Sequence, residues 1–135
     1  MTLANLRRRF PRLIRQVEKS AHSKFKKKPR LAFIEDYYPC AKCTIRTQGN
    51  SSPKKVVEVT KTKVFIPKRL AKENGVLAEA VTLHELREAL ASQNGQNKTK
   101  CHRIAVKLDK TYAKKLGLSR SLRLLVRRHY RWENR

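Results

Sequence analysis

The sequence predicts a small α+β fold that carries basic extensions at both ends. Apolar residues recur at helical spacing in the first 20 positions, short β-branched runs occupy the middle of the chain, and an arginine-rich helical pattern closes it. A chain of 135 residues, 39% of them hydrophobic, is long enough for one small mixed core. We therefore expect a basic N-terminal helix and extension over 1–30, followed by an α+β domain over 31–135.

The net charge limits what the protein can bind. Lys and Arg number 34 against 10 Asp and Glu, so the formal net charge is +24. Residues 1–30 hold 11 basic residues and one acid, and residues 92–135 hold 13 and two, so most of the excess lies at the ends. An enzyme for small neutral substrates gains nothing from this self-repulsion, whereas a polyanion converts it into binding free energy through counterion release. Nucleic acid is the expected partner, and no small-molecule substrate is predicted.

The first predicted element is an amphipathic helix. Its apolar stripe consists of Leu3, Leu6, Phe10, Leu13, Ile14 and Val17. Its basic positions, which we expect to contact RNA, are Arg7, Arg8, Arg9, Arg12 and Arg15. An arginine-rich amphipathic start is also typical of a mitochondrial targeting segment. The alternatives are a helix that covers the protein's own core and, third, a helix on a membrane surface.

Residues 23–30 form a basic run that ends in a proline and an arginine, which predicts an extended linker. The cations expected to lie along RNA phosphates are Lys24, Lys26, Lys27, Lys28 and Arg30. A solvated hinge and a nuclear localisation signal are the alternatives. No stretch of the chain approaches the roughly 18 apolar residues of a transmembrane helix, so no membrane span is expected.

Strands and short helices are expected in the centre of the chain. The predicted strands are 31–34, 44–47 and the interrupted run 57–66, with a turn at 49–53. A short helix over 68–74 should follow Pro67 and end at Gly75. Thr82 and Glu85 match a capping box, which predicts a second helix that begins there and stops in the polar segment 92–100.

The same order of elements recurs further along the chain. Residues 103–108 alternate as a strand does, and Asp109 is the expected N-cap of a helix over 110–116. At a spacing of 42 residues, five of thirteen aligned positions are identical. This pattern indicates either a duplicated strand–helix–helix unit over 56–91 and 102–133 or chance agreement between elements that use the same capping residues.

The last predicted helix is rich in arginine and almost free of acids, so its ionic partners must come from another molecule. Its expected RNA contacts are Arg120, Arg123, Arg127, Arg128 and Arg131. Tyr130 and Trp132 near its end are expected either to stack on unpaired bases or to pack within the protein.

The cysteines offer a candidate metal site. Cys40 and Cys43 have the spacing of zinc ligands, and Cys101 with His102 could complete a set of four. Reduced thiols without a metal are the alternative, which would leave the protein with no cofactor. Paired carboxylates, a nucleophile with its base and a glycine-rich phosphate loop are all missing from the sequence pattern, so we predict a protein that is not an enzyme.

Two resemblances complete the interpretation. Residues 63–70, Lys-Val-Phe-Ile-Pro-Lys-Arg-Leu, are similar to the strand segment of swapped-hairpin bacterial transcription regulators of the AbrB type. As a whole, the basic ends around an α+β centre resemble a small mitochondrial ribosomal protein. That resemblance implies a structural constituent of the ribosome, which contacts rRNA and neighbouring ribosomal proteins in mitochondria. The alternatives are a DNA-binding regulator or chromosome-packaging protein, and a cytoplasmic or nuclear location.

Overall fold

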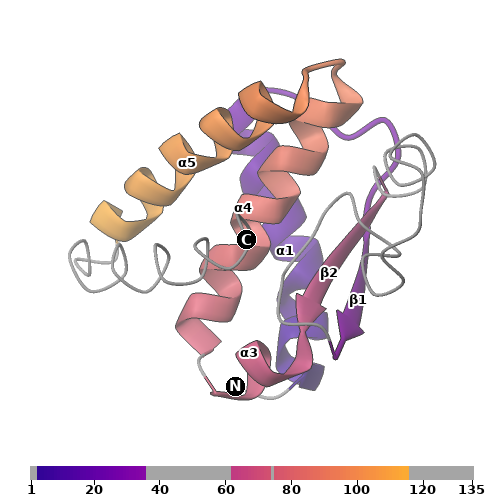
Figure 1. Cartoon of the computed structure of the whole chain (residues 1–135), viewed down its shortest axis with the longest axis vertical. Helices are drawn as coiled ribbons and strands as arrows, with labels where there is room; N and C mark the ends of the chain where they lie inside the picture. Colours follow the sequence, from indigo (N-terminus) through magenta and orange to yellow (C-terminus); the bar gives the residue numbers. More distant parts are fainter. Residues whose placement is uncertain (1–2, 36–61, 74, 116–135) are drawn as a thin grey trace.

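The computed structural model describes residues 3–35, 62–73 and 75–115. These residues form a mostly helical α+β fold with one small sheet (Figure 1), so the predicted fold class is confirmed. In chain order the elements are α1 (Leu3–Ala21), β1 (Arg30–Ile34), β2 (Lys63–Pro67), α3 (Lys68–Glu73), α4 (Gly75–Gln93) and α5 (Lys98–Lys115).

The sheet consists of β1 and β2, which pair in parallel. Leu31 lies opposite Val64, and Phe33 lies opposite Ile66. Val64 and Ile66 are fully buried against the helices, as expected for a β-branched run. The strand predicted over 31–34 and the last part of that over 57–66 are therefore confirmed, and α3 begins directly after Pro67 as predicted.

Helix α4 is the centre of the core. It packs against α1, α3, β2 and α5, and Figure 1 shows α1 and α5 on different sides of it. Every side chain from Ala80 to Leu86 is buried, so α4 has no solvent-facing side along this stretch. Any polar residue in this stretch must therefore find its partners inside the protein.

Helix α1 forms as predicted and packs its apolar stripe against this core. Its buried side chains are Leu6, Phe10, Leu13, Ile14 and Val17. The stripe thus covers the protein's own core, which was one of the alternatives that the sequence left open. The basic residues of α1 are turned outward as a consequence.

The strand predicted over 103–108 is wrong, because these residues lie inside the continuous helix α5. Cys101 and Ala105 are buried, and Leu108 and Tyr112 pack against the core, which gives the spacing of one helical face. A short apolar run fits the two-residue period of a strand as well as the 3.6-residue period of a helix. The length of the element and the residues that it packs against decide between the two. The second copy of the expected duplication thus loses its strand, and its part beyond residue 115 lies outside the described residues.

The start predicted for the second central helix is also wrong. Helix α4 begins at Gly75, so Thr82 lies in its interior, where its hydroxyl donates to the Ala78 carbonyl (2.7 Å). A threonine four residues after a carbonyl can make this bond within a helix as readily as it can cap one. Buried Leu77 and Val81 extend the helix toward its N-terminus beyond the predicted cap.

Residues 23–30 are fixed against the end of α4 rather than extended away from the fold. Phe25 and Pro29 are buried. The backbone amides of Lys26 and Lys27 donate to Gln93 Oε1 (2.9 and 3.3 Å), and the Gln93 amide donates to the Lys27 carbonyl (2.8 Å). The predicted elements at 44–47, 49–53 and 57–61 lie outside the described residues. None of the helices described is long and apolar enough to cross a membrane.

Candidate metal centre

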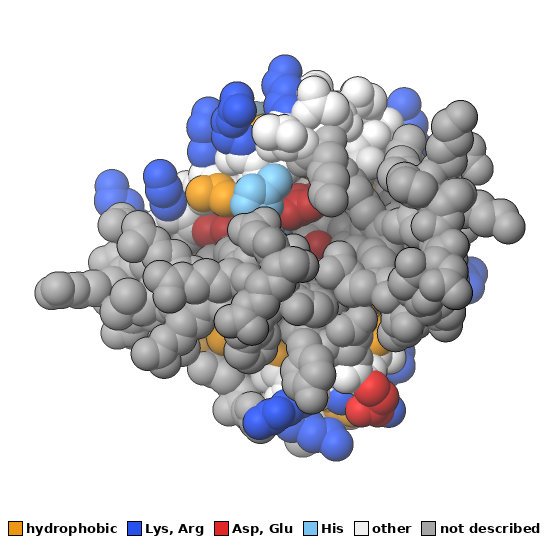
Figure 2. All heavy atoms as spheres, in the orientation of Figure 1, with side chains coloured by type: hydrophobic (Ala, Val, Ile, Leu, Met, Phe, Trp, Pro, Cys, Tyr) orange, Lys and Arg blue, Asp and Glu red, His pale blue; other side chains and the backbone are white. Residues whose placement is uncertain are grey.

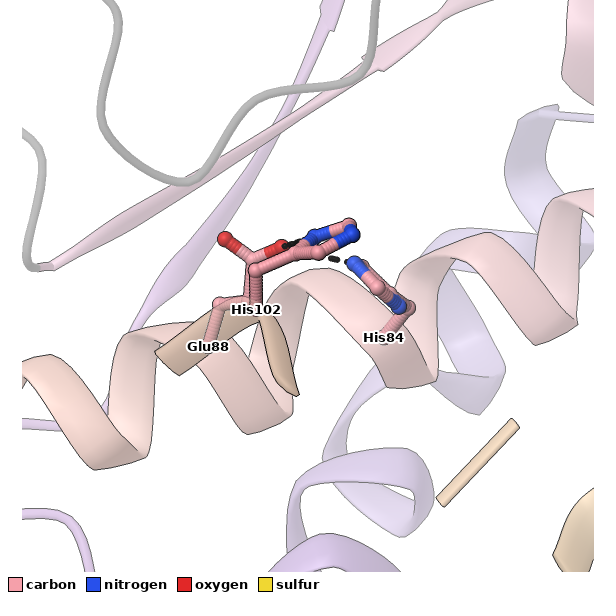
Figure 3. A group of neighbouring side chains, drawn as sticks. All are labelled: His84, Glu88 and His102. Atoms are coloured by element: carbon pink, nitrogen blue, oxygen red, sulfur yellow. Dashed lines mark hydrogen bonds and ion pairs between the residues drawn. The ribbon is translucent and has the colours of Figure 1, made fainter. Parts of the chain in front are cut away.

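Polar side chains gather where α4 and α5 pack together. His84 and Glu88 lie four residues apart on α4, so helical geometry places both on one face. His102 comes from the first part of α5 and points toward them, as Figure 3 shows. Asp109 lies seven residues further along α5, two helical turns from His102 and on the same face. We call His84, Glu88, His102 and Asp109 the α4–α5 cluster.

Short contacts connect the cluster. His84 Nε2 lies 2.6 Å from Glu88 Oε1, and His84 Nδ1 lies 2.8 Å from Asp109 Oδ2. His102 Nδ1 lies 3.2 Å from the same Glu88 oxygen, and the two imidazole rings meet edge to face with centroids 5.1 Å apart. His84 therefore joins the two carboxylates, and Glu88 joins the two histidines.

These contacts set the charge of the cluster. An ionised carboxylate only accepts hydrogen bonds, so both nitrogens of His84 must donate and its ring is cationic. Burial opposes this charge, but the hydrogen bonds to Asp109 and Glu88 outweigh it and raise the pKa of His84 well above its ordinary value. Burial likewise opposes ionisation of Glu88, yet the bonds from His102 and His84 lower its pKa to about 2. Burial raises the pKa of Asp109, while its bond to His84 acts in the other direction.

The same side chains have the chemistry of a metal site. One ligand atom from each of His84, Glu88 and His102 lies within 4.8 Å of the other two. Ligands about 2.0–2.2 Å from a tetrahedral zinc ion lie roughly 3.3 Å from each other. The Glu88–His102 distance already fits, and the Glu88–His84 contact would have to open by less than roughly 1 Å. The ligand nitrogens of His84 and His102 lie within 4.8 Å of each other and would have to approach by up to roughly 1.5 Å.

Asp109 adds the outer partner that a metal-bound histidine normally has. Histidines that bind metals through one nitrogen usually donate the other N–H to a carboxylate, which fixes the ring. The bond from His84 Nδ1 to Asp109 leaves Nε2 directed at Glu88, toward the point where the three ligand atoms converge.

One side of the cluster reaches the surface. The side chain of His84 is fully buried and that of Glu88 is 11% exposed, whereas that of His102 is 43% exposed. In Figure 2 a histidine and acidic side chains are visible on the viewed face. Glu85, which follows His84 in the chain, is buried and its charge acts on His84. The cluster thus combines buried ligands with an exposed edge.

The predicted zinc ligands are only partly brought together. His102 belongs to the cluster, but the buried thiol of Cys101 donates to the Gln96 carbonyl (3.4 Å) instead. Neighbouring residues on a helix point in directions about 100° apart, which explains why these two side chains separate. Cys40 and Cys43 lie outside the described residues.

The predicted RNA contacts on α1 lie at its surface. Arg7, Arg8, Arg12 and Arg15 are exposed, and the Arg7 guanidinium lies 5.0 Å from the centre of the Phe33 ring. Arg9 is also exposed but forms an ion pair with Glu79 on α4 (2.9 Å). The α1 arginines thus point outward from a helix whose other side is fixed in the core.

The predicted contacts after α1 are exposed as well, namely Lys24, Lys26, Lys27, Lys28 and Arg30. Arg15 and Lys19 from α1 line an open groove together with Lys24 and Lys28, and its volume is about 790 Å³. Glu18 also lines this groove, where its carboxylate accepts a hydrogen bond from the Phe25 amide (2.9 Å). The predicted contacts of the last helix, Arg120, Arg123, Arg127, Arg128, Arg131, Tyr130 and Trp132, lie outside the described residues.

No protein-family model matches this chain, and no curated protein or solved structure is similar to it.

Sequence reasoning missed His84, Glu88 and Asp109. The signal was present in the i,i+4 spacing of His84 and Glu88, but a helix start at Thr82 placed His84 in the first turn and Glu88 in the second, near a helix end rather than in the core. Asp109 was assigned to an N-cap, which separates it from His102. In a strand, residues seven apart point to opposite faces, whereas in a helix they share one. Because residues 103–108 were predicted to be a strand, His102 and Asp109 were not expected to share one face.

Proposed function

We propose that the α4–α5 cluster binds a divalent metal ion, with Zn²⁺ as the first candidate, and supports metal-dependent hydrolysis. The ligands are His84 Nε2, a Glu88 oxygen and His102. The observation that carries the proposal is that both ring nitrogens of His84 have a carboxylate partner. Nδ1 contacts Asp109 (2.8 Å), and Nε2 points at Glu88 (2.6 Å). Nitrogen and carboxylate ligands in this combination suit zinc and neighbouring transition metals.

Among the described residues three protein ligands converge, and this number favours catalysis over a purely structural role. Structural zinc sites are closed by four protein ligands, whereas catalytic sites keep one position for water or substrate. The exposed edge at His102 gives that position access to solvent. A bound Zn²⁺ lowers the pKa of its water to about 7, which supplies a nucleophile at neutral pH. Glu85 is buried and its charge acts on His84, so it is the candidate general base.

Metal titration of the purified full-length chain tests the proposal. After chelator treatment and dialysis, calorimetry with Zn²⁺ should give one equivalent bound. Glu88→Gln and His102→Gln should each weaken binding by more than the roughly 10–100-fold that loss of an outer partner causes. His22→Asn is the matched control, because His22 is an exposed histidine whose positive φ of 50° asparagine tolerates. Wild-type protein that binds no metal, or variants that bind like wild type, would reject the site.

Hydrolysis requires a separate comparison. Glu85→Gln should retain bound zinc and lose turnover of a peptide substrate such as casein or a model phosphodiester such as bis(p-nitrophenyl) phosphate. Glu88→Gln should lose both. Zinc-loaded wild type that is inactive on both substrate classes would leave metal binding standing and count against these two hydrolytic reactions.

A second candidate function is that of a structural, rRNA-binding constituent of the ribosome, with the mitochondrial ribosome as its setting. It is supported by the exposed arginines of α1, which a helix with five buried apolar residues holds in fixed positions. Phosphate contacts from Lys and Arg release counterions and favour binding. Neighbouring ribosomal proteins would be further partners.

Sedimentation of the tagged chain from its native cell tests this second function. Co-migration with a ribosomal subunit that survives high salt and disappears with ribonuclease is the expected result, and organelle fractionation would place it in mitochondria. Migration at the top of the gradient would reject this function, and a DNase-sensitive association would favour the DNA-binding alternative.

A further inference from the structure

Helix α5 has a second face that the cluster does not use. While His102 and Asp109 point toward α4, five cations three or four residues apart lie on the opposite side of the helix. These exposed residues, which we call the α5 stripe, are Lys100, Arg103, Lys107, Lys110 and Lys114. At 1.5 Å per residue the stripe is roughly 21 Å long.

Within the described part of the chain, none of the five cations forms an ion pair. The one acid of α5, Asp109, is bonded to His84 and lies 13% exposed. Solvent-exposed helices normally intersperse acids three or four residues from their lysines, which stabilises the helix by about 0.2–0.5 kcal/mol per pair. The stripe instead carries like charges at i,i+3 and i,i+4, which repel each other. A polyanion would turn this repulsion into attraction.

The apolar residues of α5 identify the kind of polyanion. A helix that lies on an anionic membrane inserts its apolar face between the lipids. In α5 this face is already occupied, because Cys101 and Ala105 are buried and Leu108 and Tyr112 pack against the core. Among the described side chains of α5, the exposed ones are those of lysine, arginine and threonine, and the other apolar ones, Ile104 and Val106, are partly buried. This favours the phosphate backbone of a nucleic acid over a membrane.

We propose that the α5 stripe is a docking surface for the phosphates of a nucleic-acid duplex. The inference deepens the second candidate function and rests on it, and it adds residues that the sequence analysis did not assign to any partner. The fixed packing of α5 on α4 holds the cations in place, so little ordering of the backbone is required when the duplex binds.

The salt dependence of binding tests the stripe. The full-length triple variant Arg103→Gln, Lys107→Gln and Lys110→Gln is compared with a control that removes three exposed or half-exposed charges elsewhere, Lys63→Gln, Lys68→Gln and Lys72→Gln. Lys68 pairs with the exposed carboxylate of Glu35 (2.8 Å), so the control also removes one surface ion pair. Affinity for duplex RNA and duplex DNA is measured between 50 and 200 mM salt. Each lost phosphate contact should reduce the slope of log K against log salt by about 0.9, so the stripe variant should lose about 2–3 and the control almost nothing.

The outcomes separate the inference from the function on which it rests. Wild type that binds no duplex would reject both. Wild type that binds, with equal slopes for the two triple variants, would reject the stripe alone. Binding to anionic phosphatidylserine vesicles but not to duplexes would also overturn the proposal. Circular dichroism checks folding, and the single variant Lys107→Gln, with an expected slope change of about 0.9, replaces the triple if it fails to fold.

Discussion

Helix α4 packs against two helices in contrasting ways. Toward α1 it meets an apolar stripe that includes Leu6, Leu13 and Val17, each no more than 1% exposed. Toward α5 it places His84 and Glu88, which are buried or nearly buried and meet Asp109 of α5. The first interface needs no explanation beyond burial of apolar surface. The second removes charges from water, which costs free energy unless good geometry and additional hydrogen bonds offset it.

The contrast shows which interface is built for stability. Replacing a buried ion pair by apolar residues of similar volume is often neutral or stabilising, so a cluster of this kind is weak evidence for a stabilising role. The metal binding that we propose would give the α4–α5 cluster a role other than stability.

The largest effect is expected from His84→Leu, which removes the cation between Glu88 and Asp109. Asp109 would remain nearly buried without its partner and Glu88 would keep only His102, at a cost of about 3–5 kcal/mol in the free energy of unfolding. Urea denaturation of the metal-free chain measures it. The triple variant His84→Leu, Glu88→Leu and Asp109→Leu should recover most of this loss while binding no zinc. A triple variant no more stable than the single one would mean that the cluster itself stabilises the fold.

A comparable loss of stability is expected at the apolar interface, but without any effect on metal. Leu13 on α1 is 1% exposed, and Leu13→Ala should reduce the free energy of unfolding by about 2–5 kcal/mol through lost burial and a cavity. Zinc affinity, measured by calorimetry below the unfolding transition, should stay at the wild-type value. A large loss of affinity would show that the two interfaces are coupled through α4.

A smaller effect on zinc affinity is expected at Asp109, which contacts the ligand His84 but not the metal itself. Asp109→Asn keeps an acceptor for His84 Nδ1–H but removes the charge that orients the ring, so zinc affinity should fall by about 10–100-fold. Asp109→Leu should cause a greater loss, since no acceptor remains. Equal affinity in wild type and the asparagine variant would show that Asp109 has no part in metal binding.

The smallest effect is expected at Tyr112, which faces Glu79 of α4 and Arg9 of α1. Burial, the charge of Glu79 and a hydrogen bond to it raise the pKa of Tyr112 to about 12, against 10.0 ordinarily, while Arg9 acts in the opposite direction. The protonated tyrosine thus contributes stability that is fully present below pH 10 and lost as pH rises toward 12. Wild type should lose stability more steeply over this range than Tyr112→Phe in urea titrations. Parallel curves would contradict the shift.

Several elements of this fold could be predicted from local patterns. The three- and four-residue spacing from Leu3 to Val17 predicted α1, and the β-branched run at Val64–Ile66 predicted β2. The errors fell where a short segment fits two periods or where a capping residue also occurs inside helices, as at residues 103–108 and Thr82. At these positions the tertiary partners decide, and the sequence does not contain them in readable form.

The sequence by itself determined the charge of this protein, its basic ends and the amphipathic character of α1, because these follow from composition and from spacing within one helix. Only the tertiary structure decided the candidate metal centre. His84 and Asp109 are 25 residues apart in the chain, and they meet because α5 turns back along α4 and presents one of its faces to it. Because α5 is helical from Lys98 to Lys115, His102 and Asp109 lie on the same side of it. The chemistry of the site thus depends on how two helices pack rather than on any local motif.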